Sequence, residues 1–156
     1  MRAEASSAWI RERADDNANG KDHMCKPDLG VYNTMSSPSF LAWRTAMFTL
    51  GKCEQTYMKI SGGFSEMPDS LKEREANDIF EALMPWLSVI LAAFGTDRIM
   101  FGSDWPVCTV GVGASEAWSK WQKVVARLCW MATLDEEAQR QIWGGTALKA
   151  YGIELK

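Results

Sequence analysis

The sequence has little of what would mark it for nucleic acid or a membrane. Its 17 Lys and Arg residues are outnumbered by 20 Asp and Glu residues, for a net charge of −3. It therefore lacks the basic balance that phosphate backbones and anionic lipids attract. The most apolar stretch, 82–94, is interrupted by Pro85 and is shorter than the roughly 18 residues of a membrane span. We expect a soluble protein with neither kind of partner.

Cysteines at C-x-x-C spacing are also absent. Cys25, Cys53, Cys108 and Cys129 include no C-x-x-C pair, which argues against a zinc knuckle or a thioredoxin-like redox site. No signal sequence is visible at the N-terminus. We therefore expect reduced thiols and a cytoplasmic protein.

What the sequence does have is typical of one globular domain. Its 156 residues are 47% hydrophobic and include eight Trp and nine Met, which we expect mainly in the core. Residues 1–21 are largely polar or charged, with only Trp9 and Ile10 as a large apolar pair. This composition predicts a disordered or frayed N-terminal segment followed by a domain over 22–156.

Helical and extended patterns alternate along that domain. They predict helices over 38–50, 69–94, 116–130 and 134–142, a last short helix ending near 151–152, and strands over 56–61 and 98–102. The expected helix boundaries are Ser37 with Pro38, Ser115, a capping box of Thr133 with Glu136, and a separation at Gly144 and Gly145. Pro85 should break or kink the long helix near Met84, because proline lacks an amide donor.

Strands that alternate with long helical segments indicate βα units and a parallel sheet. Two strands cannot make a stable parallel sheet with both faces covered. Either a further strand lies near 18–24, or material outside this chain completes the sheet. We favour the second alternative.

Asp104 is the strongest local candidate for chemistry. It lies just beyond the predicted strand 98–102, at the sheet edge where α/β proteins bind ligands. A carboxylate there can bind a metal or take a proton from water. From position alone, a turn residue that satisfies amides before Trp105 and Pro106 is the more common role.

Four segments in order resemble the amidohydrolase-related (amidohydrolase 2) family, of the lactonase-like kind. RIMFGSDWPV (98–107) is similar to the family's last-strand signature, and DHMCKP (22–27) to its Asp-His-Leu-Gly-Lys-Pro motif at the sixth strand. YMKISG (57–62) is similar to the seventh-strand motif, and IWGGTA (142–147) with Tyr151-Gly152 to the closing helix. Four motifs in order are more specific than any one.

The resemblance implies a (β/α)8 TIM barrel, of which this chain would be the C-terminal half. It would comprise about the last three βα units and be incomplete at the N-terminus. The implied activity is hydrolysis of a small-molecule lactone or similar carboxylic ester by water activated at a divalent metal, zinc or manganese.

The resemblance also assigns roles to five residues. Asp104 is implied as catalytic base or metal ligand, and His23 as a second catalytic residue or ligand reaching the same site. Lys59 and Ser61 are implied at the mouth of the seventh strand, where a cation could hold a substrate carboxylate, and Trp105 as a wall of the pocket.

Each of these residues has a simpler interpretation. A lone histidine such as His23 is most often a surface or capping residue. Lys59 could extend to solvent along its apolar stem, Ser61 could end a strand, and Trp105 could be structural.

Departures from the family pattern bear on activity. His23 is the only histidine, so the family's His-x-His pair is missing. A closed barrel needs about 250 residues, and residues 17–21 do not have the pattern of the strand expected before the Asp-His pair. Met24 and Cys25 replace the usual Leu-Gly, and Thr146 replaces the usual Asn.

We therefore expect a chain that begins within the barrel. Two candidate ligands hold a catalytic metal poorly, so the chain by itself is expected to be inactive.

Two other functions stay open at this point. One is a non-catalytic fragment that associates with itself or with another chain through the exposed half-barrel surface. The other is a metal-dependent decarboxylase, because that chemistry occurs in the same superfamily.

Overall fold

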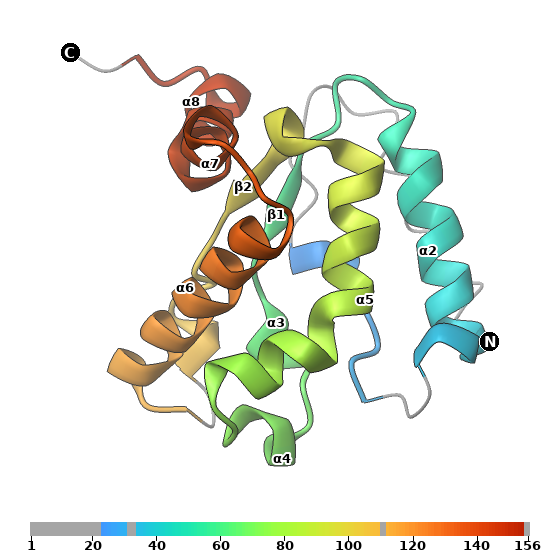
Figure 1. The fold of residues 1–156 in the computed structure, drawn as a ribbon, viewed down its shortest axis with the longest axis vertical. Coiled ribbons are helices and arrows are strands. Elements are labelled where there is room, and N and C mark those ends of the chain that lie inside the picture. Colours follow the sequence, from blue (N-terminus) through green and yellow to red (C-terminus); the bar gives the residue numbers. More distant parts are fainter. Residues whose placement is uncertain (1–22, 31–33, 110–111, 155–156) are drawn as a thin grey trace.

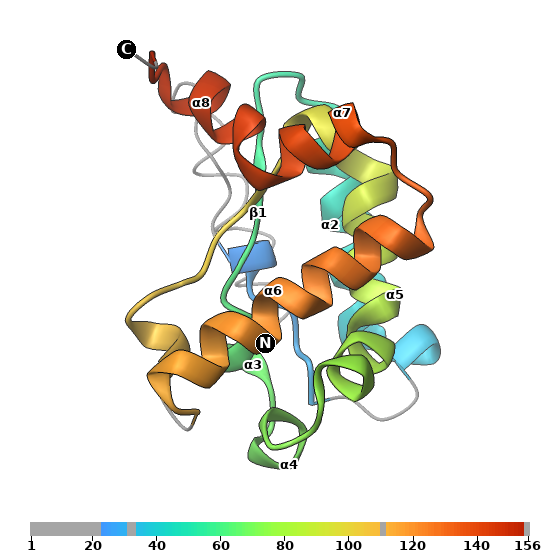
Figure 2. The same ribbon diagram turned by 60° about the vertical axis from the view of Figure 1, so that its left-hand side comes forward.

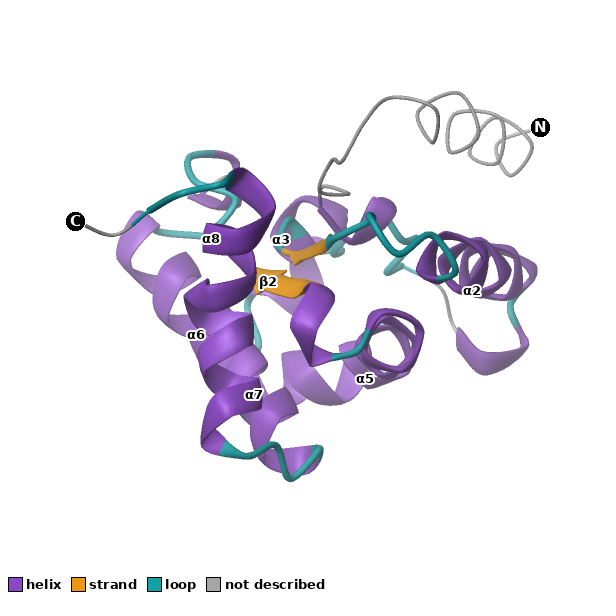
Figure 3. Ribbon diagram, turned by 90° about the horizontal axis from the view of Figure 1, so that it is seen from above, coloured by secondary structure: helices purple, strands orange, loops and turns teal. Residues whose placement is uncertain are grey.

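The computed structural model describes residues 23–30, 34–109 and 112–154. Three long helices surround a small sheet (Figures 1 and 3): α2 (Pro38–Gly51), α5 (Ala76–Phe94) and α6 (Ala114–Met131). The sheet consists of β1 (Met58–Ile60) and β2 (Ile99–Phe101). The short elements are η1 (His23–Cys25), η2 (Thr34–Ser36), α3 (Gly63–Glu66), α4 (Asp69–Lys72), η3 (Thr96–Arg98), η4 (Val107–Thr109), α7 (Glu136–Arg140), η5 (Gln141–Gly145) and α8 (Thr146–Tyr151).

The two strands pair in parallel, as the alternation of strands and helices predicts. Met58 lies opposite Ile99 and Ile60 opposite Phe101, and α5 forms half of the connection between the strands. Both strands lie inside their predicted ranges and are shorter. Of the possible strand near 18–24, residues 23 and 24 belong to the 3-10 turn η1. The rest of that range lies outside the described residues, as does the segment 1–21.

Helix α5 forms the centre of the packing. By length and composition it is the one helix among the described residues that could cross a membrane. It lies between α2 and α6, however, and Ile79, Leu87 and Ile90 are fully buried. Asp78 and Glu81 lie on its exposed side, and a helix that buries one apolar face against other helices has the pattern of a core helix.

The predicted helix over 69–94 is two helices, α4 and α5, and of the break or kink expected at Pro85 no break is seen. Pro85 lies inside α5, which runs through it without interruption and is bent in Figure 1. The chain instead leaves the helical conformation at 73–75, where Glu75 is extended with φ −67° and ψ 156°. Burial of the residues on both sides of Pro85 holds the helix together across the missing amide donor.

The predicted helix boundaries are partly confirmed. α2 begins at Pro38 after Ser37, and Gly152 ends α8 with φ 61°. The Ser115 cap is wrong, because α6 begins at Ala114 with Gly113 as its N-cap residue.

The expected cap of the helix over 134–142 and the expected separation from the last helix are also wrong. Thr133 is left-handed with φ 49°, and Asp135 caps α7 by accepting from the Ala138 amide at 2.8 Å. Gly144 and Gly145 separate no helices, because the π-helical turn η5 joins α7 directly to α8. These helices lie at the amino end of the sheet, where α7 and η5 contact η3 (Figure 2).

Bulky side chains fill the core, as the composition predicts. The Trp86 ring meets the edges of Phe40 and Trp43 at centroid distances of 4.6 and 4.9 Å, and Trp86 and Phe40 are at most 2% exposed. Such edge-to-face contacts add to the free energy gained from burial. They fix α2 against α5.

Arg98 joins the ends of α2 and α5 at the amino end of β2. Its Nη2 donates to the carbonyl oxygens of Gly51 at 3.0 Å and Ala93 at 3.4 Å, and its Nη1 donates to that of Cys53 at 3.1 Å. The last carbonyls of a helix have no partner within the helix, and a guanidinium supplies several donors at once. Arg98 therefore holds both helix ends against the start of β2.

Candidate functional site

Three polar side chains converge at the carboxyl end of the sheet. The Nδ1 atom of His23 lies 3.0 Å from Oδ1 of Asp104 and 3.1 Å from Oγ of Ser61. Ser61 directly follows β1, Asp104 lies three residues beyond β2, and His23 begins η1. The sequence places Asp104 and His23 at one site, and the structure brings these two side chains together.

The Asp104 carboxylate is directed at the imidazole and not at the turn that follows it. Among the described residues its side chain accepts no hydrogen bond from a backbone amide, whereas Ser103 Oγ accepts from the Trp105 amide at 3.2 Å. The Asp104 side chain is 9% exposed, that of His23 is 34% exposed, and Ser61 is buried. Position alone favours Asp104 as the residue whose side chain accepts from a turn amide. In the structure, Ser103 does this instead.

The backbone that presents His23 is left-handed. His23, Met24, Cys25 and Lys26 have φ values between 49° and 55°, a conformation that costs roughly 1–2 kcal/mol per residue with a side chain. Cys25 occupies the position at which the family motif has glycine, which adopts this conformation freely. The structure thus explains why that position favours glycine in the motif.

Core packing holds this turn in place. Met24 is fully buried, and its carbonyl oxygen accepts a hydrogen bond from Nε1 of Trp43 in α2 at 3.0 Å. The Lys26 amide donates to the His23 carbonyl at 2.9 Å. Backbone conformations of this kind persist only where the surroundings impose them, and here α2 does so.

Two glycines allow the close approach of the three side chains. A Cβ on Gly62 would lie 2.6 Å from Cβ of His23, and Gly62 itself has φ 71°. A Cβ on Gly102 would lie 3.0 Å from Cβ of Ser61. In the sequence, Gly62 is the last residue of the motif YMKISG (57–62). That motif is the one signal that could have identified Gly62 as part of the site.

Cys108 lies beside the site, and no sequence pattern singles it out. Its side chain is buried, and its amide donates to the Asp104 carbonyl oxygen at 2.9 Å. Burial raises the pKa of the Cys108 thiol, and the negative charge of Asp104 raises it further. The thiol is therefore protonated and unreactive at neutral pH.

The other predicted site residues differ in their surroundings. Trp105 is 74% exposed next to Asp104. The Nζ atom of Lys59 lies 5.5 Å from the ring centre of Tyr151 in α8, and Ser61 contacts His23 from a buried position. Their roles in binding substrate stay predictions.

The described residues do not by themselves make a metal centre. Across 23–30, 34–109 and 112–154, no group of three or more His, Cys, Asp or Glu side chains is placed to hold a metal ion. His23 and Asp104 supply two suitable ligand types, an imidazole and a carboxylate. Catalytic zinc sites keep three protein ligands, so this pair fits part of such a site.

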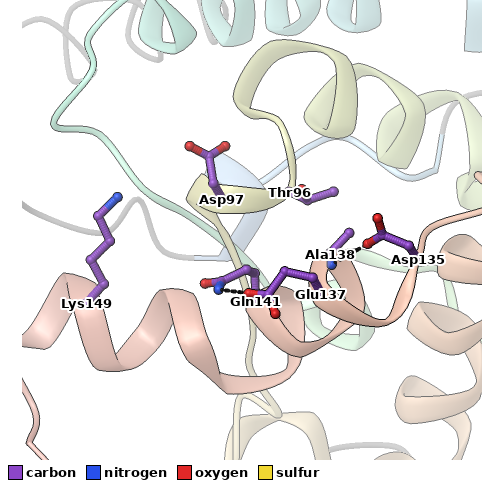
Figure 4. A pocket seen from close by; sticks show the side chains of 7 residues that line it. All are labelled: Thr96, Asp97, Asp135, Glu137, Ala138, Gln141 and Lys149. Atoms are coloured by element: carbon purple, nitrogen blue, oxygen red, sulfur yellow. Dashed lines mark hydrogen bonds between the residues drawn. The ribbon is translucent and has the colours of Figure 1, made fainter.

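A cavity of about 490 Å³ lies at the other end of the sheet, beside η3 and α7 (Figure 4). Its lining residues are mostly polar: Thr96, Asp97, Asp135, Glu137, Ala138, Gln141 and Lys149. Two of its polar groups are paired within the wall, as Asp135 caps α7 and Glu137 accepts from Gln141. The cavity is separate from the His23–Asp104 pair and contains none of the predicted site residues.

Comparison with known proteins gives consistent matches. A family model described as amidohydrolase matches residues 22–153. The chain is 33% identical to L-rhamnono-gamma-lactonase of Scheffersomyces stipitis and 33% identical to L-fucono-1,5-lactonase of Burkholderia multivorans. Each match covers 85% of this chain, but only 40% and 42% of the relative.

The fold comparison agrees. A crystal structure of a Burkholderia multivorans amidohydrolase with bound zinc superposes with a TM-score of 0.76 at 29% identity, covering 98% of this chain and 50% of that one. The chain thus spans less than half the length of these curated relatives and half of the solved structure. The expected partial (β/α)8 barrel is confirmed.

Proposed function

This chain belongs to the amidohydrolase family, and on that premise we propose that the protein hydrolyses a lactone or a similar carboxylic ester. The observation that carries the proposal is the pairing of His23 with Asp104 at 3.0 Å at the carboxyl end of the sheet. Two similar proteins are named as sugar lactonases, which supports a cyclic ester as the substrate class. Because the chain spans about two fifths of their length, the activity is proposed for a whole barrel.

Asp104 and His23 are proposed to manage the proton of the attacking water. Ester hydrolysis needs a positioned group that removes this proton and later returns one to the leaving alkoxide. An imidazole in hydrogen-bond contact with a carboxylate can do both, because one ring nitrogen takes up and returns the proton while the carboxylate on the other nitrogen stabilises the imidazolium. Ser61 and Gly62 keep the two groups in contact.

A divalent metal, zinc or manganese, is proposed as the cofactor of the whole protein. When bound, such an ion polarises the ester carbonyl and lowers the pKa of a bound water. His23 and Asp104 are the residues of this chain suited to ligate it, and the further ligands would come from elsewhere in the barrel. A similar protein crystallised with bound zinc supports this assignment.

Trp105 and Lys59 are proposed to contact the substrate. Trp105 is the most exposed large hydrophobic side chain of the described residues and directly follows Asp104, so its ring can form one wall of the pocket. Lys59 is on β1 next to Ile60 and carries a cation suited to a carboxylate. A substrate contact for Ser61 stays a prediction, and its bond to His23 also suits a positioning role.

A chimera tests the function. The segment of the Burkholderia multivorans lactonase that matches this chain would be replaced by residues 22–153, and hydrolysis of L-fucono-1,5-lactone measured with added zinc or manganese. We expect turnover, and a loss of about 100-fold or more in the Asp104→Asn variant, because a general base contributes about that much. Asp97→Asn, at the amino end, is the matched control and should retain activity.

Two outcomes of this experiment would contradict the proposal. A folded chimera without lactonase activity would overturn the function. Turnover that survives Asp104→Asn would overturn the role of Asp104. The chain by itself is proposed to be inactive, and lactone hydrolysis by the purified 156-residue chain with either metal would show that expectation to be wrong.

Self-association is a second proposal, favoured by the exposed apolar surface. Among the described residues, Trp105, Trp130 and Met35 are between 64% and 74% exposed. Side chains of this size are enriched at interfaces. We expect the mass measured by light scattering to rise with concentration, and a monomer at every concentration would rule the proposal out. The described cysteines are free thiols, in keeping with the cytoplasmic location that stays a prediction.

A further inference from the structure

We infer that Ser61 and Gly62 are positioning residues that hold the imidazole proton of His23 on Nδ1, leaving Nε2 as the nitrogen that does the chemistry. The position of the proton follows from the contacts of the described residues. Only the use made of Nε2 rests on the proposed hydrolysis.

The first step is the contact with Asp104. An ionised carboxylate only accepts hydrogen bonds, so the atom that faces it must be a donor. Nδ1 of His23 lies 3.0 Å from Oδ1 of Asp104, with the carboxylate largely shielded from water. The proton of the neutral imidazole is therefore on Nδ1, since the hydrogen bond made by one ring nitrogen decides the tautomer.

Ser61 adds a second contact to the same nitrogen. Its Oγ lies 3.1 Å from Nδ1 and accepts from Nδ1–H when the proton is there. Ser61 is 1% exposed, so water does not readily take the place of either partner. Ser61 directly follows β1 and Asp104 lies in the loop after β2, so one ring orientation brings Nδ1 to both partners.

Gly62 makes room for that orientation. A side chain at this position would bring a Cβ to 2.6 Å from Cβ and 2.9 Å from Nδ1 of His23. These distances are too short for real contacts, so any substitution would push the ring away from its two acceptors. The left-handed turn at 23–26 limits how far His23 can move in response.

This arrangement leaves Nε2 as the ring nitrogen for chemistry. Among the described residues, no group is hydrogen-bonded to Nε2 of His23. An imidazole with its proton on Nδ1 carries a lone pair on Nε2, which can take a proton from water or bind a metal ion. Asp104 contacts the opposite ring nitrogen at 3.0 Å, the arrangement found where a carboxylate orients a ligating or catalytic histidine.

Nuclear magnetic resonance can test the inference directly, because His23 is the only histidine of the chain. In the full ¹⁵N-labelled chain without metal or substrate, long-range proton–nitrogen correlations identify each ring nitrogen and its protonation. At a pH where the imidazole is neutral, we expect Nδ1 in the protonated range and Nε2 in the unprotonated range. A proton on Nε2, or rapid averaging between the two forms, overturns the inference.

Paired variants separate positioning from general stability. Ser61→Ala should raise the share of the Nε2–H form about fivefold, as expected for the loss of one hydrogen bond, while Ser39→Ala in α2 leaves it unchanged. Gly62→Ala should abolish the preference for Nδ1. Gly152→Ala is its control, because Gly152 shares a positive φ but a Cβ added there would meet no atom within 4 Å.

The two proposals fail separately. If Ser61→Ala and Gly62→Ala both keep the wild-type tautomer ratio, these residues do not position the ring, and lactone hydrolysis is unaffected as a proposal. If the chimera is inactive while Nδ1 of His23 is protonated, the hydrolysis fails and the positioning stands.

Discussion

The two ends of the parallel sheet use their polar side chains in opposite ways. At the amino end, Arg98 donates to three backbone carbonyl oxygens. At the carboxyl end, His23, Ser61 and Asp104 bond to one another, and four successive residues are left-handed. At the amino end, polar side chains satisfy backbone carbonyl groups. At the carboxyl end, polar side chains contact one another, and the backbone adopts a conformation that is unfavourable for residues with a side chain.

The difference follows from the direction of the strands. In barrels built from βα units, the loops after the strands carry the chemistry and the opposite face serves stability. Substitutions at the two ends should therefore have different effects. Those at the amino end should lower the free energy of unfolding, and those at the carboxyl end should alter the environment of the His23 imidazole. Four changes test this separation, and the largest effect is expected at Arg98.

Arg98→Met should lower the free energy of unfolding by about 3 kcal/mol, because hydrogen bonds to a charged donor are each worth roughly 1.5–3 kcal/mol. It removes the donors for Gly51 and Ala93 and keeps much of the apolar stem. Urea denaturation measures the loss, and the His23 ring resonances should not move. A loss below about 0.5 kcal/mol, or a shifted imidazole, would contradict the separation of the two ends.

Trp43→Phe is expected to affect both properties, because Trp43 links α2 to the turn that carries His23. Losing the 3.0 Å hydrogen bond to the Met24 carbonyl should cost about 1–2 kcal/mol, as for a buried acceptor left unpaired. The His23 resonances should shift as well. Trp130→Phe is the matched control, as Trp130 is 66% exposed, and an equal effect of the two variants would argue against the link.

Alkaline pH should weaken the carboxyl end through Cys108. The fold raises the pKa of this thiol above its ordinary value of 9.0, by burial and by the charge of Asp104. A raised thiol pKa gives stability that is complete below pH 9 and is lost as the pH rises through the folded-state pKa. Stability measured between pH 8 and 11 should fall less steeply in Cys108→Ala than in the wild type, and identical slopes would exclude this origin.

The smallest effect is expected for Arg140→Ala at the amino end. Arg140 pairs with Glu137 one turn away in α7, and both side chains are more than half exposed. Exposed pairs of this kind contribute less than about 0.5 kcal/mol. Thermal unfolding with and without salt would measure it, and a loss comparable to that of Arg98→Met would mean that exposed charges, and not the bonds to carbonyls, stabilise this end.

The sequence predicts the parts of the fold that depend on strong local signals. The strands at 58–60 and 99–101 and helix α2 lie where hydrophobic patterns and Pro38 indicate. Asp104 and His23 could be placed together because each belongs to a motif at the end of a barrel strand. Resemblance to such a motif assigns the segment to a particular strand of the barrel, whereas composition and periodicity do not.

What could not be predicted depends on contacts between distant residues. His23 and Ser61 are 38 positions apart, so no local pattern reveals their bond or the need for Gly62 beside it. Thr133 matches a capping box, yet Asp135 caps α7 because the chain reaches its helical path only there. Pro85 is tolerated because burial on both sides outweighs one lost hydrogen bond, and a local reading of the sequence does not include that burial.

The crossover through α5 also sets the order in which the parts of the molecule can come apart. Met58 and Ile99 pair across the whole length of that connection, so β2 lies beside β1 only while α5 is docked. Asp104 follows β2, whereas His23 belongs to η1, which contacts β1. A fluctuation that parts the two strands would therefore separate His23 from Asp104 while α2, α5 and α6 are still helical, and exchange of the strand amides should report on how often these two side chains are in contact.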